Sequence, residues 1–244
     1  MARRVKSTIM VSSYMDKVEA AEVFDGVMLG DGSITLPSSY NNAYFIMNLS
    51  GTKTLEYLSS VRTALLTLSI PVKTTYPKVL KGTSKGKVYY YCRLQSGCCQ
   101  LLTEQYHRWY PSRRKVVPED VSLTPITLAH WFMGDGSSYL DERYHYVSVT
   151  ITLCTDGYRE QEVALLADKL HSININVSLV YHTAVRNGRG MRIIIRQDSV
   201  NRFMDVVGPY VIEPYEYKLK YKEVPDGGIR RQRKTRLSIN RPEY

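Results

Sequence analysis

The strongest constraint on the fold of this chain is an internal duplication. One segment reads Phe24-Asp-Gly-Val-Met-Leu-Gly-Asp-Gly-Ser33, and a second reads Leu128-Ala-His-Trp-Phe-Met-Gly-Asp-Gly-Ser137. Both are apolar runs that end in Gly-Asp-Gly-Ser, and their aspartates, Asp31 and Asp135, lie 104 residues apart. In a chain of 244 residues, a repeat of this length predicts two similar halves.

The repetition continues in the segments that follow each motif. In the first half, apolar spacing and β-forming residues predict a strand over 43–50, a helix over 53–69 capped by Thr52, strands over 72–76 and 88–94 around a turn at 81–87, and a helix over 97–109. In the second half they predict a strand over 146–152, a helix over 157–171 capped by Asp156, strands over 177–185 and 191–196 around a turn at 186–190, and a helix to Val207 capped by Asp198. Each half therefore has the order αββαββα, and its adjacent strand pairs favour an α+β fold with antiparallel sheets.

Two pairs of basic residues lie at nearly the same distance from the two motif aspartates. Arg93 follows the first aspartate by 62 residues, as Arg196 follows the second by 61. Lys115 follows the first by 84 residues, and Lys218 follows the second by 83. This agreement favours duplication over chance.

Proline and charge distribution predict the boundaries of the halves. The segment from Pro111 to Pro125 contains three prolines, and its centre is typical of a linker. The predicted organisation is an N-terminal extension (1–15), a first repeat (16–112), a linker (113–124), a second repeat (125–221) and a basic C-terminal tail (222–244).

The motif itself predicts a close helix pair. We expect a helix from about Asp16, with Gly32 as a left-handed C-cap, and with Gly26 and Gly30 on one face where another backbone can approach. If the two motif helices meet there, their aspartates lie side by side at negative helix ends and repel each other. Divalent cations such as Mg²⁺ would relieve that repulsion and could activate water at a phosphodiester. A single Asp-Gly would be an ordinary turn, whereas the matched pair favours a site; the helical flanks exclude an aspartic protease.

The charge balance indicates the kind of partner. Lys and Arg number 33 against 23 Asp and Glu, a formal charge of +10. Such a chain is either merely a soluble basic domain or a binder of polyanions, of which nucleic acid is the commonest. No apolar run is long enough to span a membrane, the apolar stretch after Arg4 is too short for a signal peptide, and the four cysteines form no C-x-x-C pair. We therefore expect no membrane partner and a soluble protein in a reducing compartment, wherever the host genome lies.

The two motifs resemble the nine-residue signature of the LAGLIDADG homing endonucleases, over Phe24–Gly32 and Leu128–Gly136. The similarity covers about residues 16–221 and is to the single-chain, two-repeat members, which implies a monomer. It implies pseudo-twofold-related repeats, motif helices packed at the centre and two saddle-shaped antiparallel sheets straddling DNA. His130 departs from the pattern because Gly26 holds the equivalent position, so the helix pair cannot pack symmetrically.

The resemblance also implies roles for particular residues. The eighth motif positions, Asp31 and Asp135, would be catalytic metal ligands, assisted by the carbonyls of Gly30 and Gly134. Lys115 and Lys218 match the lysine that lies beside the active site, although each could be an ordinary solvated lysine. Mg²⁺ would be the cofactor, with Mn²⁺ or Ca²⁺ as substitutes.

The strands after each motif are expected to read DNA. Residues on alternate positions share one face of a strand, so they can reach base edges together; these are Tyr89, Tyr91, Arg93, Arg192 and Arg196. The basic residues near strand ends would contact phosphates; these are Lys73, Lys78, Lys81, Lys85, Lys87, Arg186 and Arg189. The halves differ at these positions, which predicts a long, non-palindromic target.

The leading hypothesis is a metal-dependent endonuclease that cuts double-stranded DNA at a specific site and leaves short 3′ overhangs. The alternative is an intron-encoded maturase that binds intron RNA with the same fold. A DNA-binding regulator on a degenerate copy of the fold is a third possibility, which the two intact aspartates disfavour.

Overall fold

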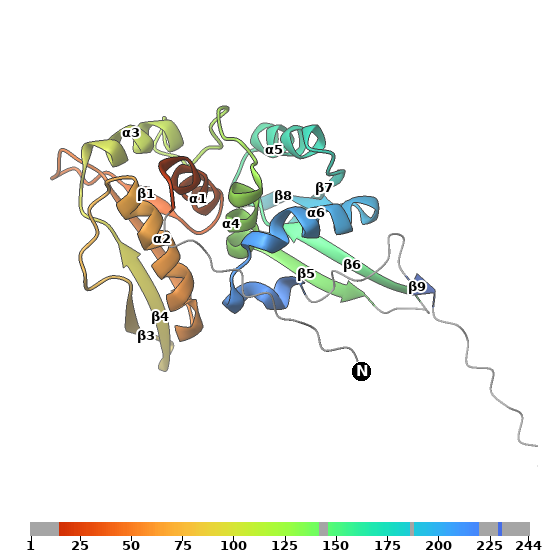
Figure 1. The fold of residues 1–244 in the computed structure, drawn as a ribbon, viewed down its shortest axis with the longest axis horizontal. Coiled ribbons are helices and arrows are strands. Elements are labelled where there is room, and N and C mark those ends of the chain that lie inside the picture. The colour runs from red at the N-terminus through yellow and green to blue at the C-terminus, as the bar shows by residue number, and fades with distance from the viewer. Residues whose placement is uncertain (1–14, 142–145, 186–187, 220–228, 231–244) are drawn as a thin grey trace, which may run out of the picture. The chain divides into compact units, whose positions relative to one another are not determined.

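The structure is a computed structural model that describes residues 15–141, 146–185, 188–219 and 229–230 (Figure 1). The chain divides into two compact units, one up to Thr127 and one from Leu128 onward. The predicted N-terminal extension apart from residue 15, and the predicted basic tail apart from 229–230, lie outside the described residues. Among the described residues, no helix is long and apolar enough to cross a bilayer.

The first unit has the predicted order of elements. Its helices and strands are α1 (Lys17–Leu29), β1 (Ser33–Thr35), β2 (Tyr44–Ser50), a 3₁₀ turn (Thr52–Thr54), α2 (Leu55–Thr67), β3 (Lys78–Ser84), β4 (Lys87–Gln95) and α3 (Gln100–Trp109). Four antiparallel strands form one sheet in the order β1-β2-β4-β3. Helix α2 packs against β4 and α3 against β1 and β2, so helices cover one face of the sheet (Figure 1).

The second unit repeats this plan. Its elements are α4 (Pro125–Asp135), β5 (Gly136–Asp141), β6 (Tyr146–Leu153), α5 (Glu160–Ser172), β7 (Val177–Val185), β8 (Gly188–Ile195), α6 (Val200–Val207) and 3₁₀ turns at Gln197–Ser199, Gly208–Tyr210 and Glu213–Leu219. The strand order β5-β6-β8-β7 is that of the first sheet, and a short β9 (Ile229–Arg230) pairs with β6. The α+β class and the duplicated αββαββα order are confirmed.

Each unit has its own aromatic core. Phe24 of α1 contacts Phe45 of β2 with ring centroids 6.0 Å apart in the first unit. Phe132 of α4 contacts Phe203 of α6 edge to face, at 5.2 Å, in the second. The motif helix of each half is thereby fixed against an element of its own half, with its apolar side chains removed from water.

The beginning of α1 is as predicted. The carboxylate of Asp16 accepts hydrogen bonds from the backbone amides of Val18 and Glu19, at 2.7 and 2.9 Å. The Glu19 side chain in turn accepts from the Asp16 amide at 3.3 Å, which completes a capping box.

Three other predicted caps are wrong. The helix predicted from residue 53 begins as a 3₁₀ turn after Gly51, and α2 proper follows Thr54 rather than Thr52. Helix α5 begins after Arg159 and α6 after Ser199, not after Asp156 and Asp198. Asp156 instead forms an ion pair with Arg192. Hydrogen bonds between a guanidinium and a carboxylate are stronger than those that a carboxylate accepts from the exposed backbone amides at a helix start.

The third strand of the first half is also displaced from its prediction. Residues 72–76 form no strand, and β3 runs over Lys78–Ser84, which includes most of the predicted turn. The turn is only Lys85 and Gly86, both with positive φ, at 49° and 75°. Positive φ at both central residues belongs to the two-residue hairpin turn whose twist matches the strands, so pairing continues up to it.

Candidate DNA-cleavage site

The end of each motif helix is held by a lysine from a distant segment. Lys115 Nζ donates hydrogen bonds to the carbonyls of Gly30 and Gly32, at 2.9 and 2.8 Å. Lys218 Nζ donates to the carbonyls of Phe132, Met133 and Gly136, at 3.0, 2.8 and 2.6 Å. Neither helix has a basic residue in its own last turn, so these ammonium groups supply the positive charge that a helix C-terminus favours.

The two lysines are equivalent in the duplication, as their spacing predicts. The carbonyl that both engage belongs to the glycine directly after the aspartate, Gly32 in one half and Gly136 in the other. They differ in burial, since Lys218 is only 6% exposed and Lys115 is half-buried. All three protons of the Lys218 ammonium have a carbonyl partner, so this group stabilises the turn that carries Asp135.

The glycines after the aspartates are required for close approach. A Cβ on Gly32 would lie 2.7 Å from Val27 Cγ1 and 2.9 Å from the Val27 carbonyl oxygen, and one on Gly136 would collide with the ring and carbonyl of Phe132. The prediction that Gly32 is a left-handed C-cap is wrong, since its φ lies outside the left-handed region. Its amide still bonds to the Val27 carbonyl at 2.9 Å, so the chain turns tightly back over the last turn of α1.

The carboxylates of the motif are accessible. Asp31 is exposed just after α1, and Asp135, the last residue of α4, is partly exposed. Within the described ranges, no group of three or more His, Cys, Asp or Glu side chains gathers into a metal site. Each motif end nevertheless offers an aspartate carboxylate and backbone carbonyls, which are hard oxygen donors of the kind that Mg²⁺ favours.

The open face of the first sheet bears the predicted aromatic and basic residues. Tyr89, Tyr91 and Arg93 alternate along β4; the two tyrosine rings lie 6.0 Å apart, and the Arg93 guanidinium lies 5.6 Å from the Tyr91 centroid. Arg93 Nε also donates to Asn48 Oδ1 on β2 at 2.7 Å. These side chains line a hollow of about 330 Å³ on the face opposite the helices.

The second sheet differs. The pairing of its strands makes Arg192 the equivalent of Arg93, whereas the distance from the motif suggested Arg196. Arg196 follows the end of β8 at Ile195. Arg192 forms a bidentate ion pair with Asp156, with contacts of 2.5 to 3.0 Å, and the hydrogen bond with this carboxylate raises the pKa of the guanidinium. Arg196 is exposed beyond the strand and lies 3.7 Å from Asp198.

The predicted phosphate-contacting residues are spread over both faces of the β3–β4 hairpin. Lys73 precedes the hairpin, Lys85 is in its turn, and Lys87 begins β4; all three are exposed. Lys78 pairs with Arg93 and shares its face, whereas Lys81 pairs with Tyr90 and faces the other way. Arg186 lies outside the described residues, and the side chain of Arg189 is not described.

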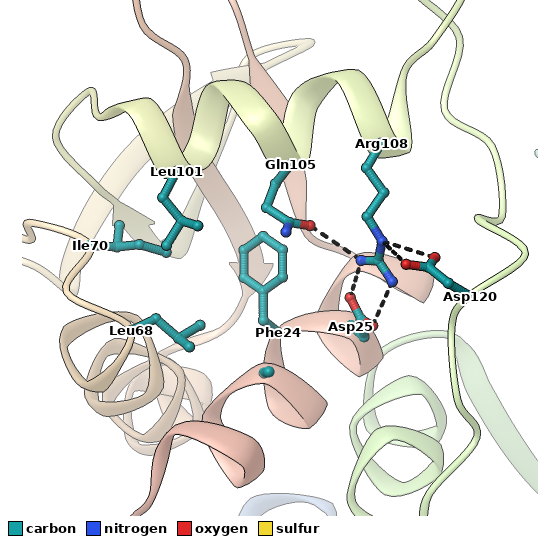
Figure 2. A pocket seen from close by; sticks show the side chains of 9 residues that line it. Phe24, Asp25, Leu68, Ile70, Leu101, Gln105, Arg108 and Asp120 are labelled. Atoms are coloured by element: carbon teal, nitrogen blue, oxygen red, sulfur yellow. Dashed lines mark hydrogen bonds and ion pairs between the residues drawn. The ribbon is translucent and has the colours of Figure 1, made fainter.

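A charged cluster on the helical side of the first unit was not predicted. Figure 2 shows Arg108 of α3 between Asp25 of α1 and Asp120: its Nη1 and Nη2 contact Asp25 at 2.6 and 3.0 Å, and its Nε contacts Asp120 at 3.0 Å. Burial alone would lower the pKa of Arg108, but the hydrogen bonds and charges of the two carboxylates outweigh it and raise the pKa. The cluster closes one end of an apolar pocket of about 370 Å³ lined by Phe24 and neighbouring side chains. In the sequence, the indication of this cluster was the acidic residue Asp25 within the first motif.

Two duplicated αββαββα halves, each with an aspartate and a lysine at the end of its motif helix, define the class of homing endonucleases. The sequence model of the LAGLIDADG DNA endonuclease family matches residues 21–203, and the chain belongs to this family. DNA endonuclease is therefore its enzyme class.

Similar proteins include both endonucleases and a maturase. The homing endonuclease I-WcaI, solved bound to its DNA recognition sequence, superposes with a TM-score of 0.70 and 22% identity, over 84% of this chain and 88% of that one; the likeness establishes the fold. The cytochrome b mRNA maturase bI2 of Debaryomyces hansenii is 24% identical over 84% of this chain and 74% of its own length. A probable intron-encoded endonuclease of Wickerhamomyces canadensis is 30% identical over 45% of this chain and 47% of its own length.

Proposed function

We propose that this chain is a divalent-metal-dependent, site-specific endonuclease that acts as a monomer on a long, non-palindromic DNA target and leaves short 3′ overhangs. The observation that carries the proposal is the repeated arrangement at the motif ends: an accessible aspartate beside a lysine bound to the backbone that carries it. The first repeat (16–112), together with Lys115 of the linker, contributes one such end, and the second repeat (125–221) contributes the other.

Asp31 and Asp135 would be the metal ligands, with the carbonyls of Gly30 and Gly134 as further oxygen donors. Mg²⁺ held there would lower the pKa of a water molecule and offset the charge of the scissile phosphate. The Gly30 carbonyl already accepts a hydrogen bond from Lys115 and retains a second lone pair for a further partner.

The two lysines would have unequal roles. Lys115 is half-buried beside an exposed aspartate, which suits an ammonium group that stabilises negative charge on the phosphate. Lys218 is buried with three carbonyl acceptors, so it would act as a positioning residue for Asp135.

DNA recognition would rest mainly on the two open sheet faces. Tyr89, Tyr91 and Arg93 lie together on the first sheet, where an arginine can pair with a guanine edge. On the second sheet Arg192 is already paired with Asp156, so the two halves would read different half-sites.

The test is cleavage of a plasmid library with random inserts in the presence of Mg²⁺, followed by sequencing of the cut ends. The wild-type chain should cut one long asymmetric site with 3′ overhangs, and Asp31→Asn and Asp135→Asn should each abolish double-strand cleavage. Asp168→Asn, at an exposed acidic position of α5, is the matched control and should cut as wild type does. Cleavage that survives either motif substitution would overturn the assignment of the carboxylates.

A second candidate function is RNA maturation, which the likeness to the Debaryomyces hansenii maturase favours. A maturase would promote splicing of its intron, and this activity should not require the aspartates. Splicing in vitro with the Asp31→Asn variant separates the two functions: splicing without cleavage supports the maturase, and no stimulation of splicing by wild type rules it out for that intron.

A further inference from the structure

A third pocket in the first unit lies apart from the hollow of the open sheet and from the Arg108 cluster. It has a volume of about 580 Å³ and lies between the segment that follows β1 and the end of α3. Its lining is Leu36, Pro37, Ser38, Tyr40, Tyr106, His107, Tyr110, Pro111 and Arg113. That volume is in the range of pockets that hold small organic ligands, about 300–1,000 Å³.

The aromatic side chains of this pocket are arranged in a stack. The rings of Tyr106 and Tyr110 are nearly parallel, with an interplanar angle of 10° and centroids 5.2 Å apart. His107 contacts Tyr106 edge to face at 5.7 Å. The Tyr110 hydroxyl accepts a hydrogen bond from the Ile34 amide at 3.4 Å, which ties the stack to β1. Tyr40, across the pocket, is 61% exposed, although a tyrosine ring has a large apolar face.

The charge of the pocket is positive. Arg113 is exposed at its lining, and none of its lining residues is acidic. Arg113 has a φ of 58°, a conformation that non-glycine residues seldom adopt, and its amide bonds to the Tyr110 carbonyl at 3.1 Å. The pocket beside the Arg108 cluster is less suited to an anion, because Asp25 and Asp120 line it and would repel a phosphate.

Flat aromatic rings beside a cation are what an unpaired nucleobase and its phosphate require. Bases that are not paired stack on tyrosine, while their backbone is held by arginine. A base inside a duplex is stacked on both faces by its neighbours and cannot add to a tyrosine stack in this way. Proline-rich peptides also dock in aromatic-lined grooves, but they supply no negative charge for Arg113.

We propose that this pocket, which we call the tyrosine pocket, binds an unpaired nucleobase of a single-stranded nucleic acid. The site is separate from the proposed cleavage site and does not depend on its carboxylates. RNA and DNA share the base and the phosphate, so the experiment has an arm for each.

The experiment measures binding of the full chain to labelled 12-nucleotide single strands of RNA and of DNA by fluorescence anisotropy. Tyr40→Ala and Tyr106→Ala should each raise the dissociation constant about tenfold, and Arg113→Gln should raise it less and reduce its salt dependence. Tyr210→Ala, at a similarly exposed tyrosine, and Lys17→Gln, at an exposed lysine of α1, are the matched controls and should bind as wild type does. Loss confined to RNA means that the pocket also reads the 2′-hydroxyl, and loss on both strands means that it reads the base alone; both results support the proposal.

A second measurement locates the base directly. Strands that contain a photoreactive 5-iodouridine should crosslink to Tyr40, Tyr106 or Tyr110, and a proline-rich peptide should not compete. Crosslinks only elsewhere, competition by the peptide, or an equal loss of duplex binding in the tyrosine variants would overturn the proposal. Asp31→Asn should leave single-strand binding intact, so failure of the cleavage assignment remains distinguishable from failure of this one.

Discussion

At the scale of single residues, buried polar groups stabilise the turns at the ends of the motif helices. Lys218 lies among three backbone carbonyls, at 2.6 to 3.0 Å, and its ammonium group is also 5.3 Å from the ring of Tyr215. A charge is tolerated at 6% exposure only because every proton has an acceptor. The same residue can therefore be required for folding and for cleavage.

Substitution of Lys218 by methionine, which is unbranched and one atom shorter, should destabilise the chain by about 3 kcal/mol. The cause is that buried carbonyls lose their donors. Urea unfolding measures the change, and Lys17→Met, at an exposed lysine of α1, should change little. An unchanged stability would mean that the contacts of Lys218 do not contribute to folding.

His130 makes stability depend on pH. It is buried within α4, and desolvation lowers its pKa from 6.5 to about 4, so the folded state keeps the imidazole neutral. The unfolded chain binds the proton below pH 6.5 whereas the folded chain does not, so stability falls as pH decreases from about 6.5 to about 4. At pH 5 this group alone should cost about 2 kcal/mol relative to pH 7.

The control is His130→Gln, which has no titrating group. Unfolding of this variant should be less sensitive to pH between 7 and 5 than that of wild type by the stated amount. Equal pH dependence of the two proteins would show that folding does not shift the pKa of His130.

At the scale of elements, local pattern predicted the helices and strands better than it predicted their ends. Strand β7 has its predicted bounds, because alternation and β-forming residues continue up to the turn. Asp156 and Asp198 were reasonable caps by residue type, yet Asp156 pairs with Arg192 and Asp198 accepts a hydrogen bond from Asn176 at 3.5 Å, and both partners are distant in sequence. The displaced β3 has the same explanation, since pairing with β4 extends the strand into residues that locally favour a turn.

The tight turn after α1 should depend on a glycine. Gly32→Ala places a Cβ 2.7 to 2.9 Å from two atoms of Val27, so we expect about 2 kcal/mol of destabilisation and a weaker contact with Lys115. Gly157→Ala is the matched control because no atom lies within 4 Å of its Cβ position. Thermal unfolding of the two variants compares them, and equal melting temperatures would contradict the close packing at Gly32.

At the scale of the whole molecule, duplication has produced two sheets of the same topology with different chemistry. The first sheet presents Arg93 beside two tyrosines, whereas the second has Arg192 bound by Asp156. Identical strand order therefore does not imply identical side chains, and this difference supports the proposed asymmetric target.

Arg93→Ala should weaken cleavage of the cognate site and relax specificity at one base pair, by about 1–3 kcal/mol. Arg192→Ala should instead remove the hydrogen bonds that the guanidinium donates to Asp156 and mainly reduce stability. Sequencing the cut ends from the random library for both variants, together with unfolding measurements, separates the effects. Relaxed specificity at one position in both variants would show that Arg192 also reads a base.

The sequence by itself determined the duplication, the α+β class, the order of elements, and the aspartates and lysines of the motif ends. These follow from periodicity and from spacing along the chain, which are local or repeated signals. The tertiary structure alone decided that Lys218 is buried on three carbonyls, that Asp156 holds Arg192, and that the tyrosines at the end of α3 form a pocket with the segment after β1. Each of these joins residues far apart in sequence, and whether a polar side chain meets water, a backbone group or an opposite charge is fixed only when distant segments come together.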